Sequence, residues 1–94
     1  MDFKQLGVSN SLVMLLGQHA ILKPTIVQQQ SIPSVYNKKD LIVQSETGSG
    51  KTLCFAVPII DLIEPIRKVQ ALIITPTREL AKQVALEFVK FSDH

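Results

Sequence analysis

The sequence predicts an α/β fold, in which short parallel strands alternate with helices. Residues 41–43 and 71–74 are short apolar runs bounded by polar residues, a composition typical of buried strands. Between them, residues 51–63 are apolar on nearly every side, as expected for a helix that is buried from several directions. Strand, helix and strand in this order predict a parallel, right-handed βαβ unit.

Two helices are predicted before the first strand. Residues 9–16 form an apolar run with Ser9 or Ser11 as N-cap. Residues 25–36 carry apolar side chains at helical spacing, and Pro33 inside this run predicts a kink or an early stop. The segment between the two helices is a connection, because Pro24 disfavours helical geometry at the residue before it.

A last helix is predicted after the second strand. Thr75, Pro76 and Thr77 offer N-cap and first-turn residues. Apolar side chains then recur at helical spacing and are interpreted as a core stripe, formed by Leu80, Val84, Phe88 and Phe91.

Length and composition set limits on the class of protein. Ninety-four residues suffice for one small domain, and a net charge of +2 does not by itself indicate nucleic-acid binding. The apolar run at residues 12–16 is far shorter than the ~20 residues of a membrane span. Cys54, the single cysteine, is interpreted as a small buried residue. We therefore expect an intracellular, cytoplasmic protein with no membrane contact.

A glycine loop follows the first predicted strand, in the stretch VQSETGSGKT that ends at Thr52. Gly48 and Gly50 allow the backbone to wrap closely around an anion, so that consecutive N–H groups converge on a phosphate. Lys51 can reach the terminal phosphates of a nucleotide, and the Thr52 hydroxyl can ligate Mg²⁺. The alternative, a glycine-serine linker, explains neither the strand before the loop nor the Lys-Thr pair after it.

The loop departs from the phosphate-loop pattern at one place. The pattern has glycine six residues before the lysine, where this chain has Ser45. Serine is small enough for the turn. Glu46 next to it is expected to point to solvent, because a buried carboxylate facing a phosphate is unfavourable.

Two further stretches make the chain resemble a known family. They are PTIVQ, from Pro24 to Gln28, and PTRELAKQ, from Pro76 to Gln83. Together with SETGSGKT they resemble the Q motif, motif I and motif Ia of DEAD-box RNA helicases, in that family's order and spacing. The resemblance implies that residues 1–94 are the N-terminal fragment of a first RecA-like helicase domain. It implies a truncated parallel sheet with flanking helices, whose later strands are missing.

The glutamine of the Q motif suits hydrogen bonding to adenine. The amide of Gln28 offers one acceptor and one donor, which match N6–H₂ and N7 of adenine but not the O6 of guanine. The family has an aromatic residue 17 positions before the start of its full motif, and this residue stacks on the base. Counted from Ala20, the corresponding residue is Phe3. The chain departs from the family's Gly-Phe pair, since it has Ala20 and Ile21 there. A solvent-facing Gln28 and a mobile Phe3 are the alternatives.

The resemblance implies ATP and Mg²⁺ as cofactors and RNA as a partner. Catalytic roles fall to Lys51 and Thr52, and the metal ligand is Thr52. The ATP-binding residues it implies are Phe3, Pro24, Thr25, Gln28, Glu46, Thr47, Gly48, Ser49, Gly50, Lys51 and Thr52. The RNA-binding residues it implies are Pro76, Thr77, Arg78 and Glu79. The alternative is that Thr77 only caps the last helix and that Arg78 is solvated or paired with Glu79.

Parts of the family's machinery have no counterpart in this sequence. None of its eight acidic residues stands in the Asp-Glu motif that the family uses for hydrolysis. In the family, two later strands lie between those of motif I and motif Ia. We therefore expect a fragment that binds ATP without turnover. Two alternatives stay open: another phosphate-loop NTPase, such as a nucleotide kinase, and a non-catalytic chain that self-associates through exposed sheet edges.

Overall fold

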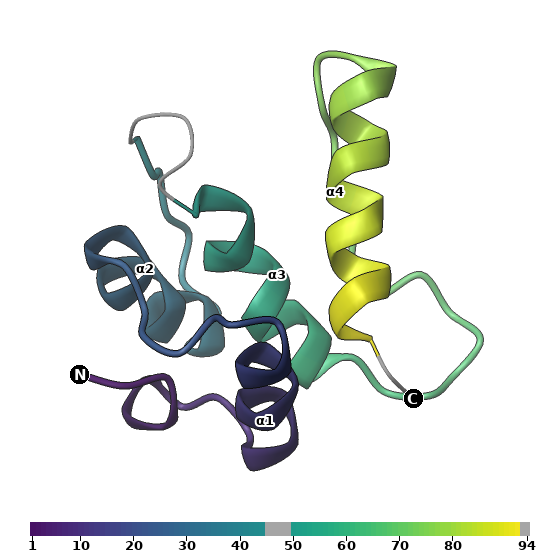
Figure 1. Cartoon of the computed structure of the whole chain (residues 1–94). Helices are drawn as coiled ribbons and strands as arrows, with labels where there is room; N and C mark the ends of the chain where they lie inside the picture. Colours follow the sequence, from purple (N-terminus) through teal and green to yellow (C-terminus); the bar gives the residue numbers. More distant parts are fainter. Residues whose placement is uncertain (45–49, 93–94) are drawn as a thin grey trace.

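The computed structural model describes residues 1–44 and 50–92 and arranges them as five helical elements (Figure 1). The first is a single 3₁₀ turn, and four α-helices follow it. Their bounds are η1 Lys4–Leu6, α1 Asn10–Gln18, α2 Ile26–Tyr36, α3 Lys51–Leu62 and α4 Arg78–Phe91. All four predicted α-helices are therefore confirmed.

Three of the helices start at the polar residue that the sequence indicates. The side chains of Ser9, Thr25 and Thr77 each accept a hydrogen bond from a backbone N–H in the first turn of α1, α2 and α4. Such a bond satisfies one of the donors that a helix start leaves free.

Helix α2 does not stop at Pro33, so an early stop there was the wrong expectation. An interior proline is unfavourable by about 3 kcal/mol. Burial outweighs it, because Ser31 and Ile32 of the same helix lie in the protein interior.

The hydrophobic core lies where α2 and α3 pack together, with η1 and α1 closing one side. Its buried members come from every element, from Phe3 at the N-terminus to Phe91 at the end of α4. Helix α4 contributes fewer buried side chains to this core. Of the predicted core stripe, Val84 and Phe91 are buried, Phe88 is half-buried and Leu80 is exposed.

The two predicted strands are not formed. Within residues 1–44 and 50–92 no strand is present, and the segments 41–44 and 69–75 have no regular secondary structure. A strand requires a neighbour for its backbone hydrogen bonds. The two segments do not pair with each other, in keeping with the implied placement of other strands between them. Their apolar side chains are consequently exposed, with Ile42 91 % and Leu72 79 % accessible.

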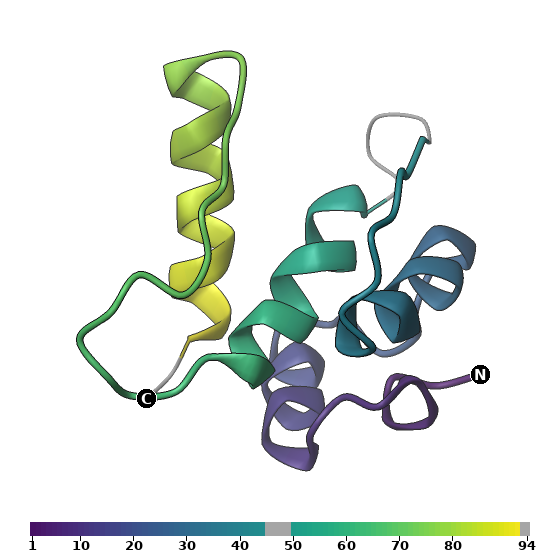
Figure 2. The same cartoon turned by 180° about the vertical axis from the view of Figure 1, so that it is seen from behind.

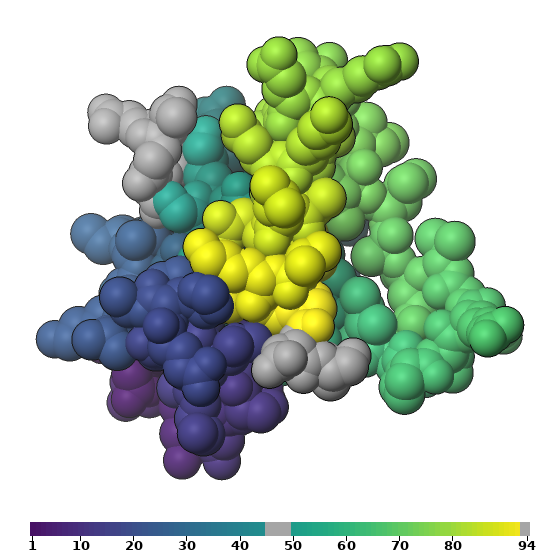
Figure 3. Space-filling view, turned by 45° about the vertical axis from the view of Figure 1, so that its right-hand side comes forward, coloured from purple at the N-terminus to yellow at the C-terminus, as the bar shows by residue number. Residues whose placement is uncertain are grey.

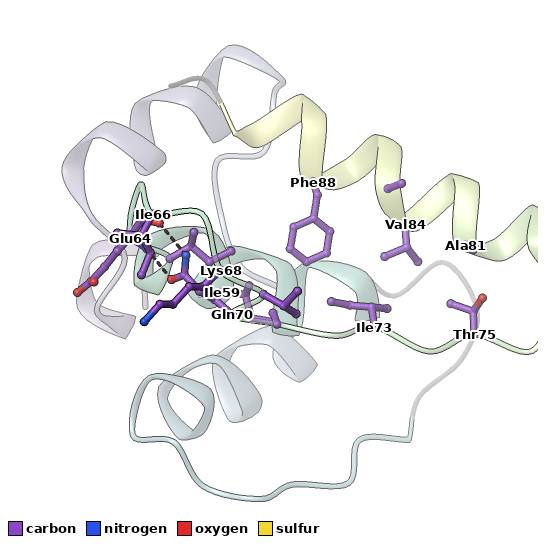
Figure 4. A pocket seen from close by; sticks show the side chains of 14 residues that line it. Ile59, Glu64, Ile66, Lys68, Gln70, Ile73, Thr75, Ala81, Val84 and Phe88 are labelled. Atoms are coloured by element: carbon purple, nitrogen blue, oxygen red, sulfur yellow. Dashed lines mark hydrogen bonds between the residues drawn. The ribbon is translucent and has the colours of Figure 1, made fainter.

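The segment after α3 runs back along α4 (Figure 2). Val69, Gln70, Ala71, Ile73 and Thr75 of this segment line a cavity of about 620 Å³, together with residues of α3 and α4. Figure 4 shows Ile59 of α3 together with Val84 and Phe88 of α4 at this cavity. No described helix is long and apolar enough to span a membrane.

Candidate nucleotide site

The start of α2 holds Gln28 in a fixed position. The Gln28 backbone N–H donates to Thr25 Oγ1 (3.3 Å), and the Thr25 backbone N–H donates to Gln28 Oε1 (2.9 Å). This reciprocal pair is a capping box, with glutamine at its third position. Gln28 is only 2 % exposed, so it is not the solvent-facing helix residue of the alternative interpretation.

The other end of the same amide reaches the start of α3. Gln28 Nε2 donates to the Gly50 carbonyl oxygen (3.1 Å). Gly50 has φ +85, in the left-handed region that favours glycine, and an added Cβ would overlap the Gln28 amide nitrogen. The backbone geometry at Gly50 therefore favours glycine, and a side chain at this position would displace the Gln28 amide.

Helix α3 begins directly after the last glycine of the loop. Gly50 is its N-cap and offers no side-chain cap. Lys51 is exposed and Thr52 is half-buried at this helix start. The backbone N–H groups of a helix start and the helix dipole favour negative charge at such a position. The described part of the loop therefore fits a phosphate group, whereas the predicted Glu46, Thr47, Gly48 and Ser49 lie outside the described residues.

Phe3 and Pro24 are both buried. Phe3 belongs to the hydrophobic core and is 2 % exposed, so that stacking on a base requires movement of its neighbours. Pro24 is buried, and its carbonyl oxygen accepts a hydrogen bond from Gln29 Nε2 (3.2 Å). Nothing in the sequence singles out Gln29 for this bond.

The predicted RNA-contacting residues stand at the exposed start of α4. The Leu80 backbone N–H donates to Thr77 Oγ1 (3.1 Å), so Thr77 is a genuine cap. Its carbonyl oxygen accepts from Thr75 Oγ1 (2.8 Å), which orders the turn before the helix. Pro76, Arg78 and Glu79 are exposed.

One cavity joins the two motifs. It has a volume of about 690 Å³ and lies between the start of α3 and the start of α4. Gly50, Lys51 and Thr52 line it on one side, and Thr75 and Pro76 line it on the other. The chain thus brings the end of the glycine loop and the start of motif Ia to a common space.

A carboxylate away from the nucleotide site connects three helices. Asp61, on α3, accepts hydrogen bonds from the Ser9 backbone N–H (2.9 Å), the Ser9 hydroxyl (2.7 Å) and the Tyr36 hydroxyl. Burial and the neighbouring Asp61 carboxylate raise the pKa of Tyr36 above its usual range. Sequence reasoning missed this anchor, although a lone acid in an otherwise apolar helix was a signal for it.

Among the described residues, no group of three or more His, Cys, Asp or Glu side chains could hold a metal ion. Mg²⁺ bound through a single hydroxyl would not produce such a group, because magnesium keeps waters and phosphate oxygens as its other ligands.

Comparison with solved structures indicates the structural class to which the chain belongs. The structure superimposes on a DEAD box protein from the hyperthermophile Methanococcus jannaschii with a TM-score of 0.90 and 41 % identity, so its helices are arranged as in a DEAD-box protein, although none of its described residues forms a strand. The superposition covers 98 % of this chain and 26 % of that one. The RNA helicase Prp28 from Chaetomium thermophilum, bound to ADP, matches with a TM-score of 0.87 and 33 % identity, over 98 % of this chain and 24 % of that one.

The family follows from the sequence. The family model described as DEAD/DEAH box helicase matches residues 25–94, and the chain belongs to this family. RNA helicase CrhR from Synechocystis is 46 % identical over 96 % of this chain, and the DEAD-box ATP-dependent RNA helicase RhpA from Helicobacter pylori is 39 % identical over 99 %. The chain spans 18 % and 19 % of the length of these two relatives. It therefore corresponds to about a fifth of such a protein.

Proposed function

We propose that residues 1–94 are the N-terminal part of the first RecA-like domain of an ATP-dependent, cytoplasmic DEAD-box RNA helicase. In a longer chain, residues 41–43 and 71–74 would be strands of a parallel sheet, separated by strands that this sequence does not contain. Family membership and the names of the relatives support the activity. In this reading, unwinding of RNA is a property of the longer protein, and the 94 residues supply nucleotide and RNA contacts.

One hydrogen bond is the main support for the proposal that this chain binds a nucleotide. The Gln28 amide connects the Q motif to Gly50, the residue before Lys51 and Thr52. A glutamine that only stabilised its own helix would need no contact 22 residues further along the chain. The contact supports the proposal, because the amide proposed to read adenine then lies beside the helix start proposed to hold the phosphates.

Each polar atom of Gln28 keeps capacity for a base. Oε1 has accepted one hydrogen bond and has a second lone pair, and Nε2 has donated one N–H and has another. An adenine would use these remaining positions through N6–H₂ and N7. Because Gln28 is 2 % exposed, the groups around it must open for the base to reach them.

At the phosphate end, Lys51 would neutralise charge on the β- and γ-phosphates, and Thr52 would ligate Mg²⁺. Phe3, Pro24, Thr25 and the loop residues 46–50 complete the proposed ATP site. The bound metal would balance phosphate charge.

For RNA, we propose that the start of α4 contacts the sugar-phosphate backbone. Support comes from the exposed position of Pro76, Arg78 and Glu79 at a helix start, where N–H groups and a guanidinium suit a phosphate. The Thr77 side chain is engaged in capping, so its contribution to RNA would come through its backbone.

A second candidate function is non-catalytic self-association of the 94-residue chain. The exposure of Ile42, Leu72 and Ile74 favours it, because the backbone around these side chains has no strand partner among the described residues. It does not compete with nucleotide binding, since the Gln28 contact lies elsewhere.

The test of the nucleotide proposal is Lys51→Ala, compared with Lys39→Ala, another exposed lysine. Titration calorimetry should show that Lys51→Ala removes the contribution of the phosphates to ATP binding and leaves binding of adenosine, which has no phosphates, nearly unchanged. Lys39→Ala should bind both like the parent chain. Equal ATP affinity in the two variants would contradict the role of Lys51, and loss of adenosine binding in Lys51→Ala would show an unfolded site.

A further inference from the structure

The two helices that carry the nucleotide motifs are joined by a polar contact at each end. Helices α2 and α3 pack against each other (Figure 1). At their starts, Gln28 Nε2 donates to the Gly50 carbonyl oxygen. At their ends, the Tyr36 hydroxyl donates to the Asp61 carboxylate. Because start meets start and end meets end, the two helices run in the same direction.

Between these two contacts the packing of α2 on α3 is apolar. Ile32 of α2 and Val57 of α3 are fully buried members of the hydrophobic core. Apolar contacts are non-directional, so they hold the helices together without fixing how far one slides along the other. A hydrogen bond depends on distance and angle, and the contacts at the two ends therefore fix that position.

An interior proline makes each helix easier to bend. Pro33 lies between the two contact residues of α2, and Pro58 lies in α3 between its two contact residues. A proline inside a helix removes a backbone hydrogen bond and favours a kink at that point. The contact at the far end of the two helices therefore restricts bending that the helix backbones alone resist less well.

The Asp61 carboxylate also holds the start of α1. It accepts hydrogen bonds from the backbone N–H (2.9 Å) and the hydroxyl (2.7 Å) of Ser9, which caps this helix. Figure 3 shows α1, in dark blue, against the last part of α4, in yellow. The connection that follows α1 carries Pro24 and Thr25. The same carboxylate thus holds the helix from which the chain enters the Q motif.

The contact between Gln28 and Gly50 tolerates little displacement. It is 3.1 Å long, and a hydrogen bond of this kind is lost beyond about 3.5 Å. A slide of α2 along α3 by about 1 Å, a fifth of a helical turn, exceeds this margin. Tyr36 stands about 12 Å from Gln28 along α2, at 1.5 Å per residue, so it acts on Gln28 through the helix.

We propose that Tyr36 and Asp61 are positioning residues of the nucleotide site. Their hydrogen bond fixes α2 along α3 and so holds the Gln28 amide at Gly50, where it reads adenine. The inference rests on the proposed nucleotide binding and extends it to residues at the opposite ends of the two helices.

Two variants of α2 separate positioning from a general effect on the fold. Tyr36→Phe deletes one oxygen atom and keeps the ring, which packs against the core. Ser31→Ala is the matched control, because it also deletes one hydroxyl from α2. The Ser31 hydroxyl is buried and donates to the Val27 carbonyl oxygen of the same helix (2.6 Å), so its loss leaves both contacts with α3 in place. Circular dichroism confirms that both chains are folded under the conditions of the comparison.

Calorimetry with ATP, adenosine and GTP measures the effect on binding. Tyr36→Phe should weaken ATP and adenosine by the same factor, about threefold or more, because a displaced Gln28 amide acts on the base. The affinity for GTP should change less, and Ser31→Ala should bind all three like the parent chain. Parent-like affinities in Tyr36→Phe, a loss confined to ATP, or equal losses in both variants would overturn the inference.

Hydrogen exchange of the Gln28 side-chain amide, followed by NMR without nucleotide, tests the same coupling separately from binding. Exchange should be faster in Tyr36→Phe than in the parent chain or in Ser31→Ala. Equal exchange in all three chains would overturn the inference, whether or not nucleotide binds. A parent chain that binds neither ATP nor adenosine would contradict the proposed function, while the exchange rates would still decide whether Tyr36 positions Gln28.

Discussion

Ala20 occupies a backbone position that suits glycine. Helix α1 ends in a Schellman motif, in which the Ala20 N–H donates to the Gly17 carbonyl (3.0 Å) and the Ile21 N–H donates to the Leu16 carbonyl (2.9 Å). Ala20 has φ +63, in the left-handed region. Family resemblance leads one to expect glycine at this position, so Ala20→Gly is predicted to stabilise the fold.

The magnitude follows from two opposed effects. A left-handed conformation is unfavourable by roughly 1–2 kcal/mol for a residue with a Cβ, and glycine removes this penalty. Glycine also gains about 0.5–1 kcal/mol of conformational freedom in the unfolded chain. Ala20 is exposed, so the change deletes no core packing. The net expectation is a gain of about 0.5–1 kcal/mol, equivalent to a rise in Tm of about 2–8 °C for a domain of this size.

Urea unfolding followed by circular dichroism at 222 nm measures this gain. The matched control is Ala85→Gly, at an exposed position inside α4, where the backbone is helical and glycine should destabilise by about 0.5–1 kcal/mol. Lys38→Gly serves as a second positive case, because Lys38 has φ +57 after the end of α2. If Ala20→Gly destabilised the chain as much as Ala85→Gly, the assignment of strain to Ala20 would be refuted.

Four other predictions have defined outcomes. Gly50→Ala should weaken ATP binding, measured by calorimetry, about tenfold or more. The new Cβ would meet the Gln28 amide, and a backbone with φ +85 is strained for alanine. An ATP affinity equal to that of the parent chain would contradict the contact between Gln28 and Gly50. Asp61→Ala should lower the free energy of unfolding, measured by urea titration, by about 2–4 kcal/mol, because three hydrogen-bond donors lose their acceptor. If Asp61→Ala were no more destabilising than Tyr36→Phe, the two hydrogen bonds from Ser9 would contribute nothing to stability. Because the folded pKa of Tyr36 is raised, stability should also fall as pH rises above about 10, less steeply in Tyr36→Phe. The 94-residue chain should release no phosphate from ATP above the buffer blank, with or without RNA, since the sequence lacks the family's Asp-Glu motif that would orient a water. Phosphate release that Lys51→Ala abolishes would refute this.

The helices were predictable because their signals are local. Ser9, Thr25 and Thr77 cap α1, α2 and α4 as the sequence indicates, and their bonds lie within one turn. The strands were not, because a strand depends on a distant partner. Residues 41–43 and 71–74 have the composition of buried strands and still form none within the described chain.

The candidate site was predictable in its parts and not in its connections. The motifs singled out Thr25, Gln28 and Gly50, and the structure joins all three through one amide. Nothing in the sequence indicates that bond, since it depends on how α2 packs against α3. The Asp61 anchor was missed for the same reason: its partners, Ser9 and Tyr36, are 52 and 25 residues away.

Titration of ATP and GTP against the parent chain and Gln28→Ala tests the central claim most directly, that this chain reads adenine through Gln28 at a phosphate-loop site. The parent should bind ATP more tightly than GTP. In Gln28→Ala the affinity for ATP should fall by roughly 1–3 kcal/mol, the worth of one bidentate contact, with a smaller change for GTP. Gln29→Ala, its neighbour in α2, should keep the preference for ATP. Equal affinities of the parent for ATP and GTP would contradict the account.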